Sequence, residues 1–240
     1  MTFTRNFSLF LLALLIFISS CSSNIYNKFD DPILVKNILE VNDSIVKKDP
    51  VNLLIQPSPV NKFLRYPLGL AINNLTNDNP DEKFRIWLEK NENRSNRLEK
   101  LISNKQIDQL KRYNNSFNDF LKNIGQEPIT INDIDIKKNI ERLKRFYDSK
   151  GYFDSNITYD SIIEFNQLTA KYSVETKERY LIDSITVNIE SKDLDSLYKV
   201  NISQSRIKKG EFFTIDKLVL ERDRLIKLFK NNGINNFQQR

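Results

Sequence analysis

The chain has 240 residues, of which 40% are hydrophobic and 28% charged, enough for one or two globular domains behind an apolar leader. It has no His and one Cys, which excludes an intrachain disulfide, zinc fingers, His-based catalytic triads and most transition-metal sites. The formal net charge is +6, but Lys and Arg alternate with Asp, Glu and Asn, so we expect a mixed solvated surface and no nucleic-acid partner.

Residues 1–20 have the pattern of a lipoprotein signal peptide. Arg5 supplies the positive start, and the apolar core over residues 7–18 is too short to span a bilayer, which takes about 20 residues. Ile18-Ser-Ser-Cys21 then matches the bacterial lipobox, so we expect cleavage before Cys21 and lipid attachment at its thiol. Several acyl chains anchor firmly, since each buried CH₂ contributes roughly 0.8 kcal/mol. The alternatives are a simple signal peptide with a chance cysteine and an uncleaved anchor.

The residues after Cys21 indicate where the anchored chain resides. Ser22 follows the cysteine, and a residue other than Asp at this position favours the outer membrane in the familiar lipoprotein sorting scheme. We expect residues 21–29 to be a short tether and the folded part to face the periplasm. Lipidation also explains an unpaired cysteine in an exported protein, because acylation consumes the thiol.

The first half of the mature chain predicts one strand followed by helices. Residues 32–41 are β-branched and apolar, which predicts a strand. A turn over 56–59 precedes a mostly buried segment, 62–75, that is helical after Pro67. Residues 81–123 carry apolar residues at near-helical spacing. Trp87 lies on this pattern, and an aromatic residue on a helical stripe predicts a core position rather than a ligand platform.

Residues 139–153 predict a helix, a glycine stop and a strand. One apolar stripe recurs at steps of four, three and four through Ile136, Ile140, Leu143 and Tyr147. Gly151 then ends the helix, because glycine adopts the left-handed conformation without a steric penalty. Either Asp133 or Asp135 is a plausible N-cap.

The remaining chain predicts strands and two more helices. Residues 155–165 and 168–176 form a hairpin with Asn166-Gln167 at its turn, and 180–189 alternates as another strand. A short helix over 193–198 precedes a final helix that Thr214 caps and Gly233 ends.

The helix and its glycine stop recur 82 positions later. Gly233 corresponds to Gly151, and the apolar residues Leu225, Leu228 and Phe229 correspond to Leu143, Phe146 and Tyr147. This self-similarity predicts two copies of one small α+β module in tandem, the second of them incomplete because few residues follow Gly233. The alternative is that any amphipathic helix ending in glycine has this pattern.

The order strand, helices, helix with glycine stop, hairpin and new strand resembles the POTRA modules (βααββ) of the BamA/TamA family of outer-membrane assembly proteins. With the lipobox, the chain is most similar to the lipidated TamL type. The likeness is carried by Lys150-Gly-Tyr-Phe153 and its second occurrence Asn231-Asn-Gly-Ile234, by residues 117–128, and by Phe212-Phe-Thr214. It covers nearly the whole mature chain, although a long helical insertion over about 60–125 and the lack of barrel strands depart from the family pattern.

The resemblance implies an α+β fold of tandem POTRA-like modules. Module 1 spans 30–179 with the insertion about 60–125, and module 2 spans 180–240 and is incomplete, as expected of a front portion without the barrel. It also implies a scaffold that binds client or partner strands at a sheet edge, with no catalytic residue, metal or cofactor. Implied partners are outer-membrane lipid through acylated Cys21, nascent outer-membrane proteins and a TamB-like periplasm-spanning protein.

The binding edge has two candidates, 155–165 and 180–189, represented by Thr158 and Ile185; the alternative is that both strands are interior. A lipid-anchored hydrolase would need paired carboxylates, for which the candidates are Asp193/Asp195 and Asp133/Asp135. Both pairs border predicted helices, so capping and solvation are the favoured uses. A peptidoglycan-binding or adhesin-like lipoprotein is the third interpretation.

Overall fold

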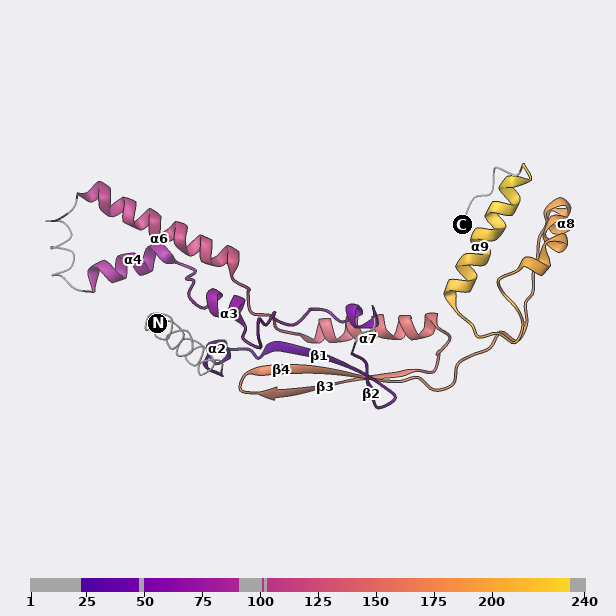
Figure 1. Cartoon of the computed structure of the whole chain (residues 1–240), viewed down its shortest axis with the longest axis horizontal. Coiled ribbons are helices and arrows are strands. Elements are labelled where there is room, and N and C mark those ends of the chain that lie inside the picture. Colours follow the sequence, from indigo (N-terminus) through magenta and orange to yellow (C-terminus); the bar gives the residue numbers. More distant parts are fainter. Residues whose placement is uncertain (1–22, 48–49, 91–100, 102, 234–240) are drawn as a thin grey trace, which may run out of the picture. The chain divides into compact units, whose positions relative to one another are not determined.

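The computed structural model describes residues 23–47, 50–90, 101 and 103–233, shown in colour in Figure 1. The predicted signal peptide and Cys21 lie outside the described residues, as do residues 48–49, 91–100, 102 and 234–240. None of the described helices combines the length and apolar character that crossing a membrane requires.

The described elements form an α+β fold. The strands are β1 (Ile33–Val41), β2 (Ser44–Ile45), β3 (Asn156–Glu164) and β4 (Gln167–Glu175). The helices are α2 (Ser23–Tyr26), η1 (Pro50–Leu54), α3 (Leu68–Asn73), α4 (Pro80–Glu89), α6 (Asn104–Ile124), α7 (Asp133–Ser149), α8 (Lys192–Val200), η2 (Ile202–Gln204) and α9 (Ile215–Asn231).

One mixed sheet has the strand order β2-β1-β4-β3. The Ile33 amide donates to the Asn166 carbonyl (2.9 Å) at one end, and the Asn42 amide donates to the Val174 carbonyl (3.0 Å) at the other, so β1 and β4 run parallel. A parallel pair needs a crossover, which the intervening helices supply. The predicted hairpin is confirmed by β3 and β4, and β3 is one of the two outer strands of the described sheet.

Two hairpins in this sheet turn without glycine. Phe165 and Asn166 have φ of 49° and 60°, and Asn42 and Asp43 have φ of 47° and 63°, as a type I′ turn requires. The β3–β4 turn is therefore centred one residue before the predicted Asn166-Gln167. The Asn166 side chain fixes it by donating to the carbonyls of Tyr26 (2.8 Å) and Phe29 (2.9 Å).

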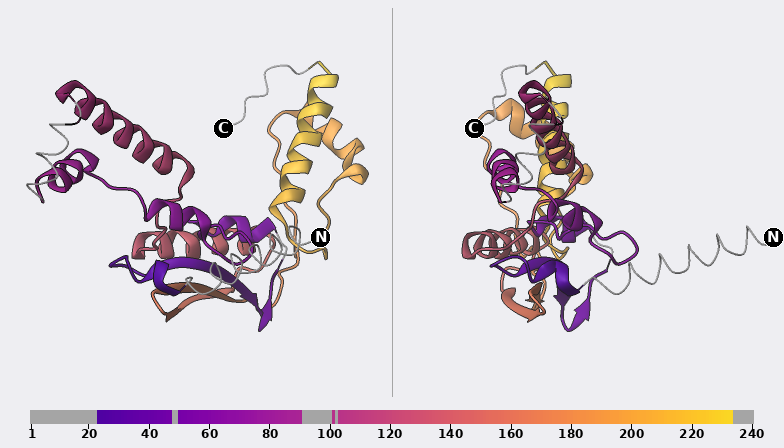
Figure 2. Two further views of the ribbon diagram at one scale, coloured as in Figure 1. Left: turned by 60° about the vertical axis from the view of Figure 1, so that its left-hand side comes forward. Right: turned by 90° about the vertical axis from the view of Figure 1, so that its left-hand side faces the viewer.

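The chain divides into two compact units. The first contains the residues up to 37 together with 57–132 and 161–170, and the second contains 38–56, 133–160 and 171–240. This division follows spatial contacts and cuts across the strands, so the predicted module boundary between 179 and 180 stays a prediction. Helix α7 lies along one face of the sheet (Figures 1 and 2). Its start and its glycine stop confirm the helix predicted there.

Asn139 of α7 is a buried polar residue that joins three segments by hydrogen bonds. Its side chain is fully buried and accepts from the Gln56 amide (3.0 Å) while donating to the Gln56 carbonyl (2.6 Å) and the Tyr172 hydroxyl (2.8 Å). Arg142, one turn later, also donates to the Asn139 carbonyl oxygen (3.0 Å). Every polar atom of this side chain thus has a partner, as burial demands, and the bonds join α7, the segment after η1 and β4.

An apolar core cluster includes side chains from the first described residues. Ile25 and Tyr26 of α2 are buried with Ile33, Val60 and Leu70. Part of the tether predicted over 21–29 is therefore folded: residues 23–26 form α2, and its apolar side chains complete this core.

The insertion predicted over about 60–125 contains α3, α4 and α6, with α4 and α6 packed against each other. Their contact is partly polar: buried Asn118 exchanges hydrogen bonds with the backbone of Asn77, and Lys111 pairs with Asp81 (3.3 Å). Trp87 is 46% exposed, so the core position predicted for it is wrong. The large apolar stripe of α6 is also exposed, at Leu110, Tyr113, Phe117, Phe120 and Ile124.

The last part of the chain departs most from expectation. The strand predicted over 180–189 is not formed, apart from an isolated antiparallel bridge between Leu181 and Phe212. The predicted helices are confirmed as α8 and α9, and the Thr214 hydroxyl caps α9 by accepting from the Lys217 amide (3.3 Å). Among the described residues, this alternating segment therefore has no neighbouring strand of the kind that alternation normally indicates.

Candidate functional site

An apolar cleft of about 740 Å³ lies between residues 182–189 and the helices α8 and α9. Ile185 and Val187 line it and are 44% and 46% exposed. From α9, Leu218, Leu225 and Phe229 face the same space. Within the described part of the chain, residues 183–189 make no backbone–backbone hydrogen bond. The cleft thus combines an apolar surface with a row of backbone donors and acceptors that pair with no other described backbone group.

Glu221, which lines the cleft, belongs to a buried ion pair. Glu221 and Arg224 of α9 are 2.6 Å apart, with side chains only 7% and 14% exposed. Burial alone would raise the pKa of Glu221, but the Arg224 guanidinium and the Arg206 amide, which donates at 2.7 Å, bring that pKa below its usual value. The carboxylate is therefore charged at neutral pH and holds the loop at Arg206 against α9.

This pair was missed from the sequence, although the 82-residue offset contains it. Asn139 and Arg142 of α7 correspond at that offset to Glu221 and Arg224 of α9. In both helices the first residue is buried, accepts from the second, and also accepts from a backbone amide of a preceding loop. The shared arrangement extends the similarity between the helices from apolar residues to a polar pair.

The two sequence motifs around Gly151 and Phe212 meet in space. Arg179 donates to the Lys150 carbonyl (2.7 Å), and its guanidinium lies 4.7 Å from the centre of the Phe212 ring. Phe153 packs against Phe213, with ring centres 5.1 Å apart. A β-carbon on Gly151 would come within 2.7 Å of the Phe213 carbonyl oxygen. The glycine therefore serves a close backbone approach as well as its positive φ.

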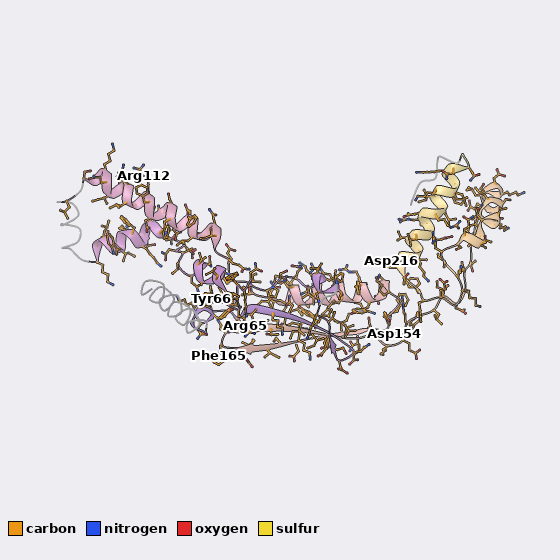
Figure 3. All side chains as sticks on the ribbon, in the orientation of Figure 1. Arg65, Tyr66, Arg112, Asp154, Phe165 and Asp216 are labelled. Carbon is orange, nitrogen blue, oxygen red and sulfur yellow. The ribbon has the colours of Figure 1, made fainter. Side chains whose placement is uncertain are left out.

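An ion pair closes the same junction. Lys150 pairs with Asp216 in the first turn of α9 (2.6 Å), and the Tyr180 hydroxyl donates to Asp154 (2.8 Å). Figure 3 labels both acids, Asp216 at the start of α9 and Asp154 before β3. The junction fixes residues 150–154, 179–182 and 210–216 to one another. The next segment, 183–189, makes no backbone hydrogen bond to another described residue.

The candidate edge predicted over 155–165 is formed. Thr158 lies on β3, whose outer side has no neighbouring strand within the described sheet. The structure does not bring Thr158 and Ile185 into one site: Thr158 belongs to the sheet edge and Ile185 to the cleft. Cys21 lies outside the described residues.

The paired carboxylates considered for hydrolysis occupy helix starts. Asp193 and Asp195 lie in the first turn of α8, where Asp195 pairs with Lys199 (2.6 Å), and Asp133 and Asp135 lie in the first turn of α7. Acidic residues at these positions interact favourably with the helix dipole. Among the described residues, no group of three or more acidic, His or Cys side chains is arranged to hold a metal ion.

Comparison with protein-family models, with characterised proteins and with solved structures found no match to this chain. The functional interpretation therefore depends on the cleft, the sheet edge and the leader.

Proposed function

We propose that the chain is the POTRA-like scaffold of a lipid-anchored outer-membrane assembly protein of the TamA/BamA type. It faces the periplasm and holds client or partner strands by backbone pairing. The observation that carries the proposal is that segment 183–189, which lines an apolar cleft, has no backbone partner among the described residues. An added strand would satisfy the free backbone groups and place alternate side chains on α8 and α9.

The similarity between the regions of α7 and α9 supports a strand as the occupant of the cleft. Strand β1 occupies the position before the helices, and it is paired with β4 under α7. Residues 183–189 stand at the corresponding point before α8 and α9 and have no such partner in the described chain. A strand in the cleft would therefore complete an arrangement that the chain already contains once. Backbone pairing accepts many sequences weakly, which suits transient contact with unfolded barrel proteins.

Proline substitution tests this function at both candidate edges. Ile185→Pro removes an amide donor at the cleft, and Thr158→Pro does so at β3. We expect Ile185→Pro to weaken capture of an unfolded outer-membrane barrel protein by the full chain. Lys208→Pro, in the exposed turn before Gly210, is the matched control and should bind as the parent does. Unchanged capture by both edge variants, with circular dichroism unaltered, would contradict the proposal.

The rival non-enzymatic function has a separate test. A peptidoglycan-binding lipoprotein would sediment with purified cell-wall sacculi, and the Ile185→Pro variant would sediment equally. The proposed scaffold instead co-purifies with a large TamB-like periplasm-spanning protein and does not sediment with sacculi.

A further inference from the structure

Two tight turns expose large apolar side chains beside α2. The first turn places Leu64 and Arg65 at φ of 48° and 70° between Phe63 and Tyr66, which form an isolated bridge. The second is the β3–β4 turn with Phe165. Phe63, Leu64 and Phe165 are 68%, 82% and 75% exposed. Figure 3 labels Arg65, Tyr66 and Phe165 near α2.

Hydrogen bonds and ring contacts attach both turns to the residues that follow the predicted lipid attachment. The Asn166 side chain donates to the carbonyls of Tyr26 and Phe29, as described above. The Lys62 ammonium lies 5.9 Å from the centre of the Tyr26 ring, and Tyr66 packs against the cluster that contains Tyr26. The turns and α2 thus belong to one folded unit.

The residue choice at these turns is not explained by local stability. A non-glycine residue with positive φ is uncommon unless it is Asn or Asp, and such turns prefer Asn-Gly. Leu64 and Phe165 accept the left-handed conformation and also leave most of their side chains in solvent. Unfavourable backbone geometry combined with exposed apolar side chains indicates a binding role.

We infer that Phe63, Leu64 and Phe165 insert into the interfacial layer of the membrane that holds the chain. The inference rests on the proposed lipid attachment at Cys21. Helix α2 begins at Ser23, two residues later, and two residues span at most about 7 Å. A lipid on Cys21 therefore keeps α2 and the two attached turns at the bilayer surface. Lys62 and Arg65 flank the apolar side chains, where their charges meet lipid phosphates.

A tryptophan probe tests the insertion in the full lipidated chain. The chain has a single Trp. In a Trp87→Phe background, Phe165→Trp places the probe at the turn and retains an aromatic side chain. Leu53→Trp is the control, since Leu53 is 76% exposed on η1 and belongs to neither turn. Each variant is reconstituted into phosphatidylethanolamine/phosphatidylglycerol vesicles with or without brominated acyl chains.

We expect the probe at 165 to shift its emission to the blue and lose most of its intensity in brominated vesicles, with the probe at 53 unaffected. Adding Leu64→Asp should reverse much of that quenching. Co-flotation with vesicles and no quenching at 165 would overturn the insertion while leaving the anchor intact. A blue shift without bromine quenching would indicate a protein contact instead, and equal quenching at both positions would also contradict the inference. A chain that fails to co-float would remove the lipid anchor itself.

Discussion

The helices α7 and α9 begin from the same local pattern and reach different tertiary environments. Each presents a buried polar residue with an Arg three positions later, an apolar stripe, and a glycine stop at φ of 91° or 87°. On the sheet side of α7, Leu143 and Tyr147 are buried. Beside α9, Leu225 still borders an open cleft, and residues 183–189 have no backbone partner in the part of the chain that the structure describes.

The surroundings of the two glycines differ in the same way as those of the two helices. A β-carbon at Gly151 meets the Phe213 carbonyl oxygen, whereas at Gly233 no described atom lies within 4 Å. Helix, cap and glycine stop are therefore encoded locally, but burial of the helix depends on a strand pair placed over it. The region around α9 therefore keeps an open cleft in which we expect a partner strand to bind.

The largest expected effect is on the buried ion pair of this open region. Glu221→Leu leaves the Arg224 guanidinium buried without its carboxylate and releases the Arg206 amide. Losing one partner of a buried pair costs about 3–5 kcal/mol, so we expect a fall of that size in the free energy of unfolding. Urea denaturation followed by circular dichroism measures it. The exposed pair of Arg222 and Asp223 on the same helix offers a control, and Asp223→Leu should change stability little.

The corresponding change in the covered region is Asn139→Leu. It leaves the Gln56 amide and the Tyr172 hydroxyl without partners inside the core. Each unsatisfied buried group costs about 1–3 kcal/mol, and we expect roughly 3 kcal/mol in total. Tyr172→Phe removes only the hydroxyl and should cost less. A cost for Asn139→Leu no greater than for Tyr172→Phe would contradict the central position of this side chain.

Substituting the two glycines should give a smaller difference in stability between the α7 and α9 variants. Gly151→Ala and Gly233→Ala both meet the left-handed penalty of about 1–2 kcal/mol. Only Gly151→Ala also forces the Phe213 backbone to move, and overpacking typically adds about 1–3 kcal/mol. Thermal denaturation of both variants should therefore show the greater loss at Gly151. Equal losses would mean that the junction adjusts without cost.

The smallest effect is a pH dependence confined to the open region. Because the pKa of folded Glu221 lies below its usual value, the pair stabilises this region fully above the unfolded pKa and loses that contribution as pH falls through the folded pKa. Glu221→Gln should flatten stability against pH in this acid range. Parallel curves for parent and variant would show that the carboxylate is not the titrating group.

Local signals in the sequence predicted much of the fold. The helix stops at Gly151 and Gly233, the Thr214 cap and the β3–β4 hairpin depend on contacts within a few residues, which the sequence displays directly. The strand predicted over 180–189 failed for a tertiary reason, because alternation indicates one buried face but cannot provide a partner strand.

The candidate site was predicted only in part. Ile185 lies in the cleft and Thr158 on an edge strand, yet Glu221 and Arg224 were missed because charged residues on a helix usually face solvent. Their burial follows from the loop at Arg206, which is distant in sequence. The exposure of Trp87 has a similar origin: helical spacing indicates a shared face, but not whether another element covers it.

Hydrogen exchange at the amides of 183–189 tests the central claim most directly. In the free chain these amides should exchange rapidly, while those of β4 are protected by their ladder. Adding an unfolded outer-membrane barrel protein should slow exchange across 183–189 and leave β4 unchanged. Rapid exchange that persists when the barrel protein is bound would contradict strand capture in the cleft.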